Sequence, residues 1–235
     1  MGGFFSHDGM FYKIGSGIAD IMVLGILWLL ASIPLVTMGA ATTAAYYVAT
    51  KKANDRDVYM WRDFWRSFRQ NFLLSTGAFL TLVAIFLLIA LNIRNIGLVE
   101  VFANAVLVAQ FFILVQAIFV MMYVFPVIAR FEMGYRQAIK TAFFMANRHI
   151  FVTISNLVLL AAVLFIAWVA MPMLAIFSMG IYIYFSSFLL VRLFKKHRPD
   201  FDAEDDDEHL APLDFSDTTL DLEKIKSLQD AEDDQ

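Results

Sequence analysis

The fold class of this protein is decided by residues 72–93, which read FLLSTGAFLTLVAIFLLIALNI and carry no charged side chain. A helix needs about 20 apolar residues to cross the hydrocarbon core of a bilayer, which is about 30 Å thick. Inside that core the backbone must satisfy its own hydrogen bonds, so a run of this length is helical. The segment therefore predicts a transmembrane helix.

Four further stretches meet the same requirement, at about 16–36, 101–129, 150–171 and 172–191. We therefore expect an all-α protein, a polytopic transmembrane helix bundle with five spans. The stretch at 101–129 would extend roughly 43 Å at a rise of about 1.5 Å per residue. That length exceeds the bilayer core, so this helix must tilt or project beyond it.

Residues 38–53, MGAATTAAYYVATKKA, are apolar but short. They could form a sixth span or a helix lying at the membrane interface. A sixth span would place outside the six basic residues that follow, and positive charges prefer the cytoplasmic side. The charge pattern therefore favours five spans. The six basic residues are Lys51, Lys52, Arg56, Arg62, Arg66 and Arg69.

With five spans, the basic connectors 37–71 and 130–149 both lie inside, and 94–100 lies outside. This arrangement predicts a multi-pass membrane protein, and the absence of cysteine fits the bacterial plasma membrane. Its N-terminus would be outside and its C-terminus in the cytoplasm.

Charge divides the chain into two parts. Residues 1–198 carry 16 Lys and Arg against 7 Asp and Glu, whereas residues 199–235 carry 2 Lys against 15 Asp and Glu. The first part is the predicted transmembrane domain. The second is predicted to be an acidic cytoplasmic tail, mostly disordered, because its like charges repel one another and few of its residues are apolar.

The cytoplasmic connectors are expected to contain short amphipathic helices. Aromatic residues at helical spacing, including Trp61 and Trp65, run beside a basic stripe. This pattern is typical of a helix at the lipid headgroup surface, and it would also suit a docking helix for a cytoplasmic partner. The candidate contact residues are Trp61, Arg62, Trp65, Arg66 and Arg69, with Arg136 and Lys140 in the second connector.

Polar residues inside the spans are candidates for functional sites. Asp20 and Arg94 both fall at the predicted outer boundary and could form an ion pair. The remaining candidates could line a solute path or bond helix to helix, which is the commoner role. They are Asn104, Gln110, Gln116 and Asn156.

The sequence contains no nucleotide-binding loop, no nucleophile elbow and no metal-ligand spacing of its four histidines, and it has no cysteine. We therefore expect no enzymatic activity, no cofactor and no metal. The basic segments give no reason to prefer nucleic acid over anionic lipid, so membrane lipids are the expected partners.

The segments 27–30 (LWLL), 33–44 (IPLVTMGAATTA) and 46–48 (YYV) resemble the N-terminal signature of the YesL-like family of bacterial membrane proteins. Phe64, Ser67, Phe68, Asn71 and Phe72 are similar to that family too. The likeness covers most of residues 1–195, and the acidic tail departs from the usual pattern. The family has no known function, and the resemblance supplies no catalytic residues.

The resemblance implies frequent gene association with carbohydrate ABC importers and glycoside hydrolases. The first hypothesis is accordingly an accessory or regulatory subunit of a carbohydrate ABC import system, in contact with an ABC permease. A self-contained small-solute transporter or channel, acting as a homo-oligomer, is the second hypothesis. A membrane scaffold or assembly factor is the third.

Overall fold

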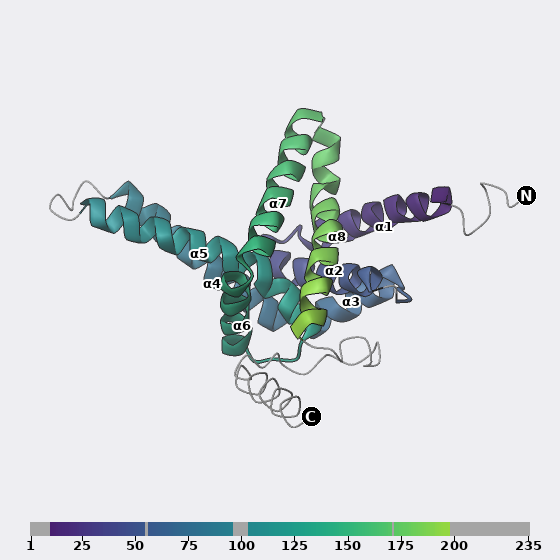
Figure 1. The fold of residues 1–235 in the computed structure, drawn as a ribbon, viewed down its shortest axis with the longest axis horizontal. Helices are drawn as coiled ribbons and strands as arrows, with labels where there is room; N and C mark the ends of the chain where they lie inside the picture. Colours follow the sequence, from purple (N-terminus) through teal and green to yellow (C-terminus); the bar gives the residue numbers. More distant parts are fainter. Residues whose placement is uncertain (1–9, 55, 96–102, 171, 198–235) are drawn as a thin grey trace, which may run out of the picture.

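The computed structural model describes residues 10–54, 56–95, 103–170 and 172–197, and the regular elements in these ranges are helices. Figure 1 shows two long helical hairpins and a separate N-terminal helix leading away from a packed centre. The elements are α1 (Met10–Ala31), the 3-10 turn η1 (Leu35–Thr37), α2 (Met38–Ala53), α3 (Met60–Gln70), α4 (Phe72–Arg94), α5 (Ala103–Arg130), α6 (Tyr135–Arg148), α7 (Ile150–Ala170) and α8 (Pro172–His197).

Helix α2 is the centre of the molecule and packs against α1, α3, α4, α5 and α8. We call α2 and the parts of these helices that pack on it the hub. Every residue from Gly39 to Lys51 is buried. Small side chains permit this enclosure: a Cβ at Gly39 would lie 2.5 Å from the Ser75 backbone oxygen of α4. Such close approach of backbones is typical of helix packing in membranes.

Four helices are long and apolar enough to cross a membrane, and they form the α4–α5 and α7–α8 hairpins. Their outer parts expose large apolar side chains, among them Leu88, Phe112 and Trp168. An apolar surface of this extent on helices of this length is a lipid-facing surface. The protein is therefore a helical membrane protein, as the sequence predicts.

The predicted spans at 72–93, 150–171 and 172–191 correspond closely to α4, α7 and α8. The helix predicted at 101–129 to be longer than the bilayer core is α5, and its final third lies in the hub, where Tyr123 and Ile128 are fully buried. The predicted span at 16–36 differs: α1 begins earlier, at Met10, and ends at Ala31, and the chain turns over the last residues of the predicted span. The predicted acidic tail, 199–235, lies outside the described residues.

Neither alternative for residues 38–53 fully describes α2. It is not among the helices long and apolar enough to span. It does not lie on a surface either, because protein encloses it on all sides. Hydropathy did not predict this position, because Ala, Thr and Gly give α2 only a modest hydropathy. The same small residues permit close packing, which makes α2 a core helix.

Candidate functional site

Helix α3 is strongly amphipathic and is fixed to the hub by one face. Asp63, Phe64 and Ser67 are buried on that face. Trp61 and Arg62 point outward, and Trp61 is 65% exposed. The rings of Trp61 and Trp65 meet edge to face with centroids 5.9 Å apart, and Trp65 and Phe68 make the same kind of contact at 5.3 Å. The helix therefore presents a rigid aromatic and basic surface, as the sequence predicts.

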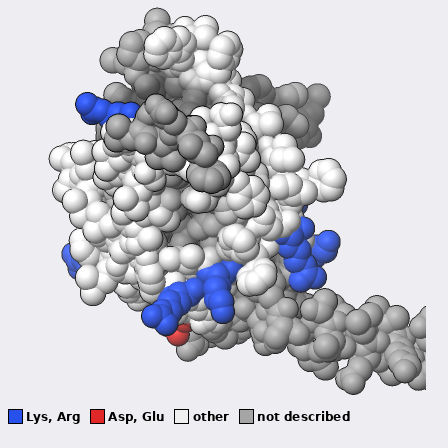
Figure 2. All heavy atoms as spheres, turned by 90° about the vertical axis from the view of Figure 1, so that its left-hand side faces the viewer, with Lys and Arg blue, Asp and Glu red and all other residues white. Residues whose placement is uncertain are grey.

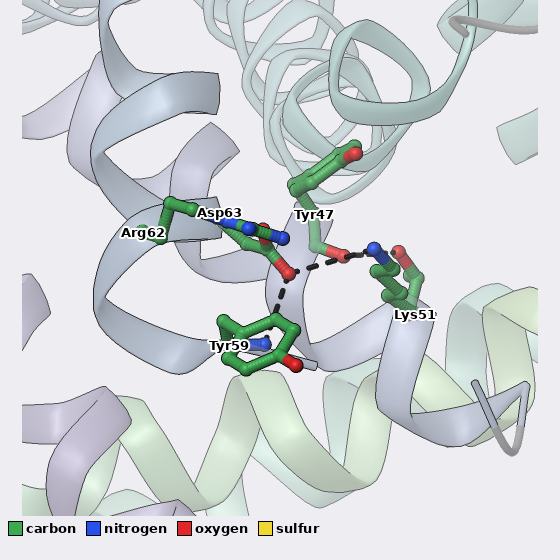
Figure 3. A network of polar contacts seen from close by, with 6 residues as sticks. Tyr47, Lys51, Tyr59, Arg62 and Asp63 are labelled. Carbon is green, nitrogen blue, oxygen red and sulfur yellow. Dashed lines mark hydrogen bonds and ion pairs between the residues drawn. The ribbon is translucent and has the colours of Figure 1, made fainter. Parts of the chain in front are cut away.

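A buried ion pair connects α3 to α2. Lys51 Nζ lies 3.5 Å from Asp63 Oδ2, and the two side chains are only 5% and 3% exposed. Figure 3 shows the Asp63 carboxylate between Lys51 and the backbone of Tyr59, whose N–H donates to Oδ2 at 3.1 Å. The other carboxylate oxygen lies 3.5 Å from Arg62 Nε. Because a buried charge is costly unless it is paired, these contacts hold α3 at a defined position.

A second ion pair lies beside the first. Asp20 of α1 is 3.0 Å from Lys52 at the end of α2. This contact corrects the predicted pairing of Asp20 with Arg94. Arg94 ends α4, whose far end points away from the hub on the side opposite the N-terminal end of α1 (Figure 1). The prediction failed because it assumed that α1 crosses the bilayer alone, without a return helix beside it.

The outer face of α3 contains a shallow hollow of about 680 Å³. Its walls combine two indole rings with guanidinium groups, and the Trp65 Nε1 donor has no hydrogen-bond partner within the described chain. That nitrogen is itself buried, so the donors open to the hollow are the guanidinium groups, and these suit an anionic or carbonyl-rich group. It is lined by Trp61, Arg62, Trp65, Arg66, Arg69 and Gln70, which include the five candidates predicted in this segment.

Arg136 and Lys140 are exposed on α6. Helix α6 packs mainly on α5, with smaller contacts to α4 and α7. These two residues therefore belong to a basic surface separate from the hollow on α3. Figure 2, seen from the side of the α4–α5 hairpin, shows basic side chains mostly toward the lower half of the molecule and an almost uncharged face above them.

The polar residues predicted inside the spans do not converge on one path. Asn104 is exposed and Gln110 is buried on α5, and Asn156 is buried on α7. Gln116 lines an apolar groove of about 230 Å³ between α4 and α5. The arrangement favours local packing roles for these side chains over a continuous polar route.

Sequence reasoning missed two features of the hub. One is the Lys51–Asp63 pair, for which the available signal was a single acidic residue within a basic stripe. The other is a set of buried hydroxyls that tie helices together: Tyr46 OH lies 3.4 Å from Ser186 Oγ, and Tyr123 OH lies 3.0 Å from Thr153 Oγ1. In the described ranges no group of three or more His, Cys, Asp or Glu residues is placed to hold a metal ion.

The comparisons with known proteins agree with the family resemblance. Residues 21–93 match the model of a family described as protein of unknown function, DUF624. This segment runs from α1 to the end of α4 and includes α2 and α3. No curated protein and no solved structure matches the chain.

Proposed function

Starting from a DUF624 segment over residues 21–93, we propose that this membrane protein is a non-enzymatic accessory subunit that docks on another membrane protein through α3. The observation that carries the proposal is the contrast between the two faces of α3. One face is fixed by the Lys51–Asp63 pair, and the other exposes Trp61 and Arg62 around a hollow. Exposed Trp and Arg on a rigid support are typical of the residues that dominate protein interfaces.

The proposed partner is the permease of a carbohydrate ABC importer, on the cytoplasmic side of the bacterial plasma membrane. The choice of partner rests on the gene association that the YesL-like resemblance implies. It is compatible with the sequence, because the chain has no nucleotide-binding loop and would depend on a partner to power transport. A short loop on the cytoplasmic face of a permease could offer the carboxylates and carbonyls that the hollow accommodates.

The experiment is site-specific photo-crosslinking in native membranes. A benzophenone amino acid replaces Trp61 in one variant and, as the control, Phe165 on the lipid-facing surface of α7. We expect an adduct with an ABC permease, identified by mass spectrometry, from position 61 and not from position 165. Adducts with lipid alone at position 61, or a dimer of this chain, would overturn the proposal in favour of a lipid contact or a homo-oligomer.

A further inference from the structure

Helices α1 and α2 form an antiparallel hairpin whose two ends differ in character. Near the turn, Trp28 Nε1 donates to Thr42 Oγ1 at 3.0 Å. At the open end, Asp20 and Lys52 are paired at 3.0 Å. These two contacts fix the pairing along the hairpin, so the C-terminal end of α2 lies level with the middle of α1, and α1 continues past it for ten residues toward Met10.

The turn of this hairpin is apolar and exposed. Ile33 and Leu35 are 72% and 71% exposed, and Val36 is also exposed. Turns that face water are usually built from Gly, Asn, Asp and Ser, whereas this one contains large aliphatic side chains. An exposed cluster of this kind at the tip of a hairpin indicates contact with an apolar medium.

The backbone of the turn is suited to such a medium. Thr37 Oγ1 donates to the carbonyls of Ala31 and Pro34 at 2.6 and 2.7 Å, and the Thr37 N–H donates to Pro34 O at 2.8 Å. Pro34 has no N–H to satisfy. Unpaired backbone groups are costly in hydrocarbon, and these bonds remove much of that cost.

The outer surface of α1 continues the apolar tip. One stripe at four-residue spacing is exposed along the helix, whereas α2 behind it is enclosed by protein. The charged groups are confined to the open end of the hairpin. The exposed stripe consists of Ile18, Met22, Ile26 and Leu30.

We infer that α1 and α2 form a re-entrant hairpin, which enters the bilayer hydrocarbon tip first from the cytoplasmic side and returns to that side. The 16 residues of α2 extend roughly 24 Å, and the part of α1 that pairs with α2, from Asp20 to Ala31, extends roughly 18 Å, so the paired hairpin does not reach across the core of about 30 Å. The turn at Leu35 lies within the membrane. The N-terminal end of α1 lies on the cytoplasmic side, in place of the exterior position that five spans would require.

Charge supports this placement independently of length. Lys52 is held against Asp20, and from Asp20 α1 runs away from the turn toward Met10, so the N-terminal end of α1 must lie on the same side as Lys52, farther from the turn. If that end were outside, Lys51, Lys52 and the arginines of α3 would be outside with it, against the preference of positive charge for the cytoplasm. The inference does not depend on any docking partner of α3.

The absence of cysteine allows a direct test with single-cysteine variants. Gly15→Cys reports the N-terminal end of α1, where an added Cβ meets no atom within 4 Å. Arg148→Cys and Asn95→Cys are the controls for the cytoplasmic and exterior sides, since both positions are exposed and neither lies on α3. Each variant is labelled with a membrane-impermeant maleimide in intact cells and in inverted vesicles.

We expect the Gly15→Cys and Arg148→Cys variants to react in inverted vesicles and the Asn95→Cys variant to react in intact cells. Reaction of Gly15→Cys in intact cells, or its failure to react from either side, would overturn the inference. A fluorescent protein that matures only in the cytoplasm, fused to the N-terminus of the unaltered chain, gives the same answer without a substitution. A dark fusion of normal abundance would overturn it too.

A second measurement locates the turn. A spin label on the Leu35→Cys variant is compared with labels on Phe165→Cys, on the lipid-facing surface of α7, and Arg69→Cys, in the hollow of α3. We expect the label at position 35 to match position 165, with several-fold more collisions with oxygen than with a water-soluble nickel complex. Accessibility matching position 69 would place the turn in water and refute the re-entrant hairpin.

Discussion

Replacement of Asp63 by Asn tests the buried ion pair of the hub most directly. The Asn side chain keeps an acceptor for the Tyr59 N–H but removes the charge that faces Lys51 at 3.5 Å. Breaking a buried pair by removing one partner costs about 3–5 kcal/mol, because the remaining charge is left in a poorly solvated place. For a chain of this size each kcal/mol lowers the melting temperature by about 2–4 °C, so we expect a fall of about 6–20 °C.

Replacing the other partner of the pair, Lys51→Met, should lower the stability by less than Asp63→Asn does. Asp63 would retain Arg62 at 3.5 Å and the Tyr59 N–H at 3.1 Å, and Arg62 is largely exposed to solvent. In the double variant Lys51→Met/Asp63→Asn, neither charge remains, so we expect a coupling energy of about 1–3 kcal/mol. The assay is thermal unfolding of the purified protein in one detergent, followed by intrinsic tryptophan fluorescence.

Two outcomes would refute this reasoning about the ion pair. One is an Asp63→Asn variant that melts within about 2 °C of the unaltered protein. The other is strict additivity of the two single replacements, which would mean that the groups do not interact. Arg69→Gln, which removes an exposed charge on the same helix, is the matched control, and we expect a change below about 0.5 kcal/mol.

Three further predictions concern other parts of the molecule. Gly180→Ala should destabilise the folded protein by about 1–3 kcal/mol, because the added Cβ would lie 2.8 Å from the Ile21 backbone oxygen and 2.9 Å from Gly25 Cα. Gly15→Ala is the control and should be neutral, so equal melting temperatures for the two variants would contradict this prediction. Gln116→Met should be neutral or stabilising by about 1 kcal/mol, because the amide nitrogen is buried without a partner in the described chain. Solute flux through reconstituted protein that is abolished by Gln116→Met would favour the transporter hypothesis over the accessory one. Trp61→Ala should leave the melting temperature within about 2 °C of the unaltered value, because the side chain is exposed, but it should reduce the amount of permease that co-purifies. Retention of the permease would argue against docking at α3.

The parts of the fold that sequence predicts are those decided by hydropathy over about 20 residues. Residues 72–93 and 150–171 become α4 and α7 with almost the predicted bounds. The basic and aromatic surface of α3 was also predictable, because it depends on the spacing of residues within one helix.

The hub was not predictable in the same way, because it depends on contacts between distant segments. Residues 33–36 are apolar, so hydropathy adds them to the first predicted span, although the chain turns there. The chain reverses direction at this turn, so α2 runs back along α1 and Lys52 contacts Asp20. No property of either residue alone indicates this contact. Asp63 offered a signal, because an isolated acid in a basic stripe is expected to have a charged partner.

The DUF624 match covers 21–93, but the hub that these residues form is completed by α5 and α8. Tyr46 in α2 reaches Ser186 of α8 at 3.4 Å, and the guanidinium of Arg130 from α5 lies 5.8 Å from the centre of the Tyr47 ring. A helix enclosed on all sides cannot be buried by its sequence neighbours alone, so the α4–α5 and α7–α8 hairpins serve the hub as well as crossing the bilayer. A partner that docks on α3 would therefore be connected, through α2, to three of the four spanning helices, α4, α5 and α8.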